Sequence, residues 1–133
     1  MITKINHIAI VAPDLDEAMG FWVEALGLPV SRVEDVPAEA VKVAFLPIGE
    51  SNLEILQPTD ESSGVARYLE KRGPGMHHIC LEVDDIEAAL AQLKAANVPL
   101  INDEPQSGHH NTRYAFIHPK GTGGVLVELY EVA

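Results

Sequence analysis

The sequence predicts an α+β fold built from two tandem βαβββ modules. The first observation is a pattern that occurs twice: a histidine, then alternating apolar and polar positions typical of a strand, then a helical stripe. The two histidines, His7 and His78, lie 71 positions apart. The second observation is that later segments recur at nearly the same spacing, as Ala44-Phe45 and Ala115-Phe116 do. An internal repeat of this length indicates a duplicated unit.

The first module is expected to span about residues 4–58. Its opening strand is followed by a helix in which apolar residues recur every three or four positions. Asp14 and Glu17 are spaced as a capping box at the start of this helix, and Gly27 suits its C-terminal end. The elements expected in order are a strand at 5–11, a helix at 15–26, a short strand at 30–33, a polar turn at 34–39 and strands at 41–46 and 52–56.

The second module, about residues 75–132, repeats this order. Asp84 and Glu87 are spaced as a second capping box, and Asn97 takes the place of Gly27 as the residue that tolerates a left-handed helix end. The linker, residues 59–74, is expected to contain a short helix. The expected elements are a helix at 65–71, a strand at 76–83, a helix beginning at 86 and strands around 115–116 and 125–129.

Composition describes one globular folding unit, and we expect a single domain over residues 1–133. The hydrophobic content of 47% and charged content of 22% are ordinary for a folded domain. A net charge of −11 argues against nucleic acid or an anionic membrane as partner. The single cysteine cannot form an internal disulfide, and neither a secretory signal nor an apolar run of ~20 residues is visible. These features predict a cytoplasmic protein.

Four residues are candidates for a metal site because they occupy equivalent places in the two modules. His7 and His78 lie on the opening strands, and Glu54 and Glu128 lie on the last strands, each flanked by apolar residues. A single histidine or glutamate on a strand is usually structural or solvated. If the two modules pair into one curved sheet, however, all four side chains converge on its concave side. Two imidazoles and two carboxylates form a suitable ligand set for a divalent metal.

The remaining histidines and the cysteine are interpreted differently. His77 faces away from His78 by strand parity and is assigned to packing. Cys80 shares the face of His78 but corresponds to Ala9, so we interpret it as a small residue that makes room. Three histidines have no counterpart in the other module and lie in loop-like stretches, where solvent exposure is expected; they are His109, His110 and His118. Contact with a ligand is the alternative for His110.

At these residues the sequence resembles the vicinal oxygen chelate superfamily, which includes glyoxalase I, extradiol dioxygenases and antibiotic-resistance binding proteins. Several stretches resemble the methylmalonyl-CoA epimerase family within it, and the resemblance covers nearly the whole chain. The matching stretches are Asn6–Ile10, Gly75–Cys80, Asp103–Pro105, His118–Lys120 and Gly124–Leu129.

This resemblance implies a glyoxalase fold, in which a curved mixed sheet has helices on its convex side. It implies an epimerase that interconverts (R)- and (S)-methylmalonyl-CoA by metal-assisted proton abstraction and return at C2 through an enolate. The acyl-CoA is then the partner, and a homodimer is implied. Cobalt is the implied metal, with zinc, nickel, manganese or magnesium as alternatives. The implied metal ligands are His7, Glu54, His78 and Glu128, and Glu128 is also the catalytic residue that exchanges the substrate proton.

The second proton-transfer group is left open. Some relatives carry a glutamate where this chain has Val43, and others have an apolar residue there. Glu39 and a held water are the two candidates. The basic residues that would bind the anionic CoA tail are also left unassigned, because isolated surface bases often only make a protein more soluble. The candidates are Arg67, Lys71, Arg72, Arg113 and Lys120.

Two other functions remain as alternatives. A glyoxalase I-like lyase would use the same ligand types, although the motifs of the second module disfavour it. A metal-free small-molecule binding protein of the same fold is disfavoured by the four intact ligand-type residues. A dioxygenase would need two histidines and one carboxylate, so Glu54 counts against it.

Overall fold

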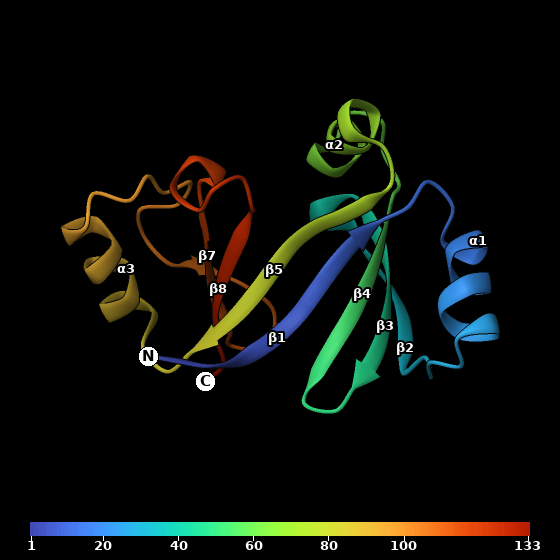
Figure 1. Cartoon of the computed structure of the whole chain (residues 1–133), viewed down its shortest axis with the longest axis horizontal. Coiled ribbons are helices and arrows are strands. Elements are labelled where there is room, and N and C mark those ends of the chain that lie inside the picture. The colour runs from blue at the N-terminus through green and yellow to red at the C-terminus, as the bar shows by residue number, and fades with distance from the viewer. The chain divides into compact units, whose positions relative to one another are not determined.

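The protein folds into a mixed eight-stranded sheet that carries helices, which confirms the predicted α+β class (Figure 1). The computed structural model describes all 133 residues. The strand order is β2-β3-β4-β1-β5-β8-β7-β6, so the strands of each predicted module are neighbours. The strands are β1 (Ile2–Val11), β2 (Arg32–Val36), β3 (Val41–Ile48), β4 (Ser51–Pro58), β5 (Gly75–Val83), β6 (Gln106–Ser107), β7 (Arg113–Ile117) and β8 (Val127–Glu131).

The helices follow the predicted positions closely. The helix expected at 15–26 is present, but its second half has π geometry, since the Leu26 N–H donates to the Phe21 carbonyl. None of the helices combines the length and the hydrophobicity that crossing a membrane requires. The helical segments are α1 (Leu15–Met19), the π-helical η1 (Gly20–Ala25), η2 (Pro37–Glu39), α2 (Gly64–Arg72), α3 (Ile86–Ala95) and η3 (Pro119–Gly121).

The chain divides into two compact units. The first unit contains Met1–His7 and His78–Ala133, and the second contains Ile8–His77. These bounds differ from those of the predicted modules because β1 and β5 each contribute residues to both units. The predicted linker lies wholly in the second unit and contains α2. That the chain forms a single domain stays a prediction.

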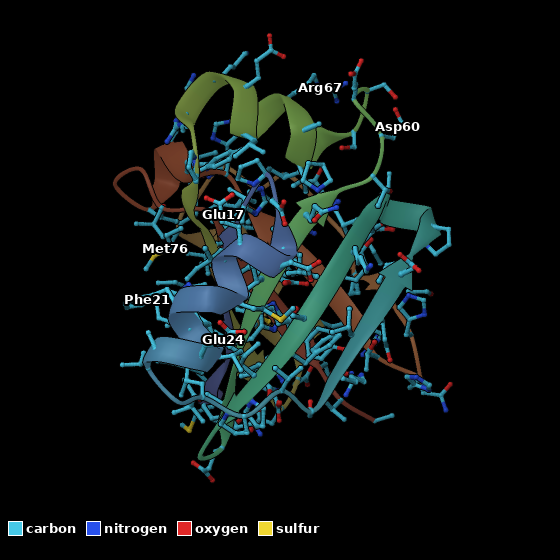
Figure 2. The ribbon with its side chains drawn as sticks, turned by 90° about the vertical axis from the view of Figure 1, so that its right-hand side faces the viewer. Glu17, Phe21, Glu24, Asp60, Arg67 and Met76 are labelled. Carbon is cyan, nitrogen blue, oxygen red and sulfur yellow. The ribbon has the colours of Figure 1, made fainter.

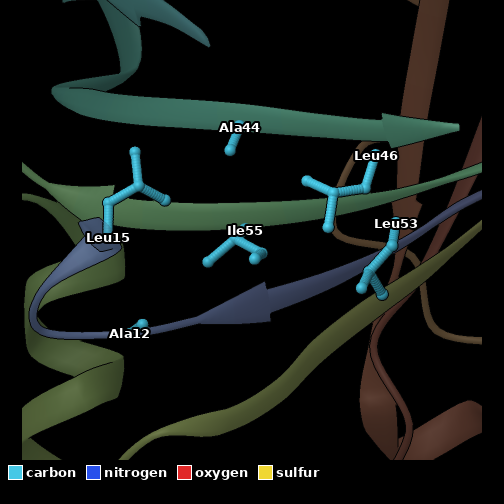
Figure 3. Packing of buried hydrophobic residues seen from close by; sticks show 6 residues of the cluster. All are labelled: Ala12, Leu15, Ala44, Leu46, Leu53 and Ile55. Carbon is cyan, nitrogen blue, oxygen red and sulfur yellow. The ribbon is translucent and has the colours of Figure 1, made fainter. Parts of the chain in front are cut away.

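The second unit has a hydrophobic core between α1 and one face of β3 and β4. β3 and β4 pair antiparallel, with Ala44 opposite Ile55, and both side chains are fully buried. Alternate residues of a strand point to the same face, so Leu46 and Leu53 extend this core. Figure 3 shows the buried cluster, formed by Ala12, Leu15, Ala44, Leu46, Leu53 and Ile55. Burial of each large side chain favours folding by roughly 1.5–3 kcal/mol.

The opposite face of these strands forms another core with α2. Ala9 and Val11 of β1 are buried there with Val43 and Leu56. The side chains that α2 packs against this cluster are Val65, Tyr68 and Leu69. The second unit is therefore apolar on both faces of its sheet.

Figure 2 shows the outer side of the helical segment α1–η1, where Glu17, Phe21 and Glu24 project from the ribbon. Their spacing of four and three residues places them on one helix face. Phe21 is 56% exposed, so this face is not part of the core. Figure 2 also shows Arg67 on α2, whose guanidinium donates to the Ser62 carbonyl.

The first unit has its core between α3 and the strands β5, β7 and β8. Ile86 and Leu90 of α3 are buried against Val83, Ala115 and Leu129. Figure 1 shows α3 beside these strands. Because Leu129 faces α3, the neighbouring residue of β8, Glu128, points to the other face of the sheet.

The predicted capping residue of the second helix is wrong by one position. Asp85 caps α3, since its side chain accepts a hydrogen bond from the Ala88 N–H. The Asp84 carboxylate instead binds the N-terminal ammonium of Met1 at 2.8 Å, and the Asp84 N–H donates to the Met1 carbonyl. Both aspartates are suitable capping residues, and the contact with the ammonium engages Asp84 elsewhere.

Two predicted strand ranges are also wrong. β2 spans Arg32–Val36, which includes half of the polar segment 34–39 that the sequence assigned to a turn. This strand is the edge of the sheet and is largely exposed, so its charged residues are compatible with pairing to β3. The last strand begins at Val127, because the Val125 N–H closes a turn onto the Thr122 hydroxyl.

Glu131 ties the last strand to the start of α3. One carboxylate oxygen accepts from the Ile86 N–H at 2.8 Å, and the other accepts from the Arg113 guanidinium at 2.7 Å. The Ile86 N–H belongs to the first helical turn, which has no carbonyl partner within the helix. The backbone bond from Ile86 and the bond from Arg113 together lower the pKa of the Glu131 carboxyl.

We expect Glu131→Ala to lower the free energy of unfolding by about 1 kcal/mol near neutral pH, the usual effect of losing a helix cap. The folded-state pKa of Glu131 is lowered, so its contribution is fully present above the unfolded-state pKa. That contribution is lost as the pH falls through the folded-state pKa. Urea unfolding should therefore separate wild type and variant at neutral pH and not in strong acid. Equal stability at neutral pH would contradict this assignment.

Candidate metal centre

Three of the four predicted ligand residues meet inside the first unit. His7 lies on β1, His78 on β5 and Glu128 on β8. The parallel pairing of β5 with β8 sets Glu128 beside Cys80, and the antiparallel pairing of β7 with β8 sets it beside Phe116. His7, His78 and Glu128 are 8%, 7% and 8% exposed. The strand register therefore gathers three ionisable side chains in a largely buried position.

The ligand atoms of these residues form a small triangle. The Nε2 atoms of His7 and His78 are 3.1 Å apart. Oε1 of Glu128 lies 3.1 Å from Nε2 of His78 and 3.5 Å from Nε2 of His7. Two ring nitrogens that both present lone pairs repel each other, so a proton or a cation must lie between them. With the Glu128 carboxylate beside the two nitrogens, the triangle could accommodate a cation.

The spacing fits one divalent cation. Ligand atoms that lie ~2.1 Å from an octahedral ion, at right angles to each other, are roughly 3 Å apart. The distances of 3.1 to 3.5 Å among the three atoms are close to this value. Two imidazole nitrogens and one carboxylate oxygen are also ligands that first-row divalent metals accept. His7, His78 and Glu128 could together hold such an ion.

Glu128 is ionised in this environment. Burial alone would raise the pKa of its carboxyl, but the two adjacent imidazoles, His7 and His78, outweigh burial and lower the pKa to about 2. The ring nitrogens therefore stabilise the carboxylate form. The side chain presents negative charge at every physiological pH.

Aromatic and sulfur groups surround the triangle. The rings of His7 and His78 meet edge to face with centroids 5.2 Å apart, and the Phe116 ring contacts His78 at 5.6 Å. Cys80 is fully buried, and its sulfur lies within 4.8 Å of ligand atoms of His7 and Glu128. The sequence interpreted Cys80 only as a small residue. Its shared face with His78 was the available sign that it borders the site.

Asn6 and Glu82 also adjoin the site, and the sequence did not predict this. Nδ1 of His7 lies 2.8 Å from Oδ1 of Asn6. Nδ2 of Asn6 donates to Oε1 of Glu82 at 2.9 Å, and Nζ of Lys4 lies 3.9 Å from the same oxygen. Strand parity places Asn6 on the face opposite His7, so the alternating pattern gave no sign of the contact.

The fourth predicted ligand, Glu54, belongs to the second unit. It lies half-buried on β4 opposite Phe45, and its neighbours Leu53 and Ile55 face α1. Its part in the site stays a prediction. Glu39, a candidate second base, is exposed at the end of η2.

The remaining candidates have local partners or are exposed. The His77 ring contacts Tyr68 at 4.6 Å, which fits its assignment to packing. His109 and His110 are exposed, and His118 accepts a hydrogen bond from the Lys120 N–H. Among the proposed CoA counter-charges, Arg113 pairs with Glu131 and Glu87, and Arg72 lies 5.6 Å from the Tyr68 ring; Lys71 and Lys120 are exposed.

Residues 6–116 of the chain match the Glyoxalase/Bleomycin resistance protein/Dioxygenase superfamily. The chain belongs to this superfamily. The match runs from Asn6 to Phe116, so it covers most of the first predicted module and the larger part of the second, including the opening strands that carry His7 and His78. The resemblance seen in the sequence is thereby confirmed.

Two proteins named as epimerases are similar to this chain over nearly its whole length. The mitochondrial methylmalonyl-CoA epimerase of Homo sapiens is 42% identical over 127 residues, which cover 95% of this chain and 72% of the relative. The ethylmalonyl-CoA/methylmalonyl-CoA epimerase of Cereibacter sphaeroides is 41% identical over 134 residues, covering 99% of this chain and 100% of the relative.

A solved structure agrees with these relatives. A variant of the Streptomyces coelicolor methylmalonyl-CoA epimerase, in complex with 2-nitronate-propionyl-CoA, has a TM-score of 0.90 and 37% identity. That comparison covers 100% of this chain and 96% of the solved chain. The fold of this superfamily member is therefore that of the epimerase structures.

By the resemblance seen in the sequence, Val43 stands where some relatives are expected to carry a glutamate. It is 3% exposed and belongs to the core formed with α2. We expect Val43→Ala to lower the free energy of unfolding by roughly 0.5–2 kcal/mol, because it leaves a small cavity, and to change turnover less. Urea unfolding and a turnover assay on the same preparation measure both effects. A loss of turnover with unchanged stability would show that this position acts in catalysis.

Proposed function

We propose that this chain is a methylmalonyl-CoA epimerase, which interconverts (R)- and (S)-methylmalonyl-CoA. The observation that carries the proposal is the likeness to named epimerases along the full chain, at 42% identity to the human enzyme and 41% to the Cereibacter enzyme. The buried triangle of His7, His78 and Glu128 supplies the chemistry that this reaction needs. Epimerisation removes the proton from C2 of the substrate and returns a proton to the other face of the same carbon.

We further propose that His7, Glu54, His78 and Glu128 are ligands of a divalent metal, with cobalt expected. The spacing of the three atoms in the first unit supports this ligand set, and Glu54 is included by its equivalence to Glu128 in the repeat. A bound cation supplies positive charge that offsets the negative charge developing on the substrate's thioester oxygen.

Glu128 is the proposed proton carrier at C2. Its carboxylate is buried and ionised, so it can accept a proton without first losing one. The transfer depends on a C2–H bond that a bound cation would acidify. Burial excludes water that would compete for the proton.

Val43 cannot be the second proton-transfer group, because its side chain carries no ionisable atom. Glu39 and a held water stay the predicted candidates. A homodimer and a cytoplasmic location also stay predictions, and the single reduced cysteine supports the second of them.

The test of the function is incubation with one stereoisomer of methylmalonyl-CoA in D2O. We expect the wild type to form the other stereoisomer and to introduce deuterium at C2, as measured by chirality analysis and mass spectrometry. We expect Glu128→Gln to slow this exchange at least ~10²-fold even at saturating metal, since an amide oxygen can coordinate but is a very poor proton acceptor. Glu54→Gln is the matched control and should be milder. Equal losses that follow only lost metal would show that Glu128 is not a base.

We expect His7→Ala and His78→Ala each to remove most of the bound metal and nearly all turnover. The fold should persist, because the core of the first unit lies between α3 and the other face of its strands. Metal analysis and circular dichroism of the purified variants measure the two effects. Full metal occupancy with wild-type turnover in either variant would reject the proposed site.

A further inference from the structure

We propose that Asn6 and Glu82 are positioning residues that fix which nitrogen of the His7 ring carries a proton. The inference rests on the proposed function, because it concerns a residue of the proposed metal site. It adds two residues that lie outside the ligand set. A chain of hydrogen bonds leads from Glu82 to Asn6 and from Asn6 to His7.

The first link fixes the orientation of the Asn6 amide. Nδ2 of Asn6 lies 2.9 Å from Oε1 of Glu82. An ionised carboxylate only accepts hydrogen bonds, so the amide nitrogen must face Glu82 and the amide oxygen must face away. A rotated amide would set two acceptor oxygens against each other. Nζ of Lys4, 3.9 Å from the same carboxylate oxygen, adds a positive charge beside it.

The second link fixes the tautomer of His7. The oriented Oδ1 of Asn6 lies 2.8 Å from Nδ1 of His7. A carbonyl oxygen only accepts, so Nδ1 of His7 must carry the hydrogen. A neutral imidazole has one N–H, which leaves a lone pair on Nε2. In this tautomer only His78 can donate a hydrogen bond to the Glu128 carboxylate. Nε2 is the atom that faces His78 and Glu128 in the triangle.

The consequence is a His7 ring prepared to bind a cation. Without the Asn6 oxygen the neutral ring could place its hydrogen on Nε2, and a metal would first have to displace it. Hydrogen-bond partners of this kind typically change metal affinity about 10–100-fold when they are removed. The Lys4–Glu82 pair is partly exposed, with side chains 34% and 21% accessible, and such pairs add little to stability. Metal affinity is thus the property that the chain of bonds should control.

Two variants at Asn6 distinguish its effect on the His7 tautomer from simple packing. Leu and Asp are both close to Asn in size, but only Asp presents an acceptor to Nδ1 of His7. We expect Asn6→Leu to bind Co²⁺ about 10–100-fold more weakly than wild type. The double variant Asn6→Asp/Glu82→Gln should recover most of the affinity, because the introduced glutamine amide can donate to the new carboxylate and that carboxylate can accept from His7. Isothermal titration with Co²⁺ measures each affinity.

The matched control is Glu131→Ala, which also removes a hydrogen-bonded carboxylate of the first unit. It should lower the free energy of unfolding and leave Co²⁺ affinity unchanged. Nitrogen-15 NMR of the metal-free wild type gives an independent measurement and should show the hydrogen of His7 on Nδ1.

Wild-type affinity in Asn6→Leu, no recovery in the double variant, or a hydrogen on Nε2 in the metal-free wild type would each overturn the inference. These measurements need no acyl-CoA substrate. A chain that binds Co²⁺ as expected but exchanges no C2 proton would retain this inference and lose the proposed function. If wild type bound no Co²⁺, the NMR measurement would still decide the His7 tautomer.

Discussion

The contact between one buried carboxylate and two imidazole nitrogens is the interaction on which the site depends. Glu128 lies 3.1 and 3.5 Å from the two Nε2 atoms, in a position where an unpaired charge would be strongly destabilising. The carboxylate is tolerated because the ring nitrogens oppose the effect of burial on its pKa. The same compensation defines a place where positive charge is favoured. The contact that makes the buried Glu128 carboxylate tolerable is thus the same contact that makes the site suitable for a cation.

The fold separates this arrangement from the residues that hold the first unit together. Along β8, Leu129 faces α3 and Glu128 faces the site; along β5, Val83 faces α3 and Cys80 faces the site. Alternation of side chains makes this separation possible, because successive residues of each strand point to opposite faces of the sheet, one toward α3 and one toward the site. Polar atoms can therefore gather on one face without opening the apolar core on the other.

The hydrogen bonds around the first unit serve two different purposes. Glu131 satisfies the N-terminal turn of α3 and binds Arg113, which joins a helix to two strands. Glu82 and Asn6 contact no helix end, and their bonds lead to His7 instead. The first set contributes to stability, and we propose that the second set controls the state of an imidazole. Both use carboxylates as acceptors, so only the identity of the final partner distinguishes them.

The sequence alone determined the repeated strand–helix order, the helix positions and three residues that the structure brings together. Those features follow from periodicity, which assigns each residue to a face before any tertiary contact is known. Only the tertiary structure decided that Asp85 and not Asp84 caps α3, because the competing N-terminal ammonium is 83 positions distant in the chain. It also decided that the edge strand extends through charged residues, that Cys80 borders the site and that Asn6 reaches His7. Each of these depends on which strands are neighbours and on the direction of individual side chains, and neither property is encoded in local spacing.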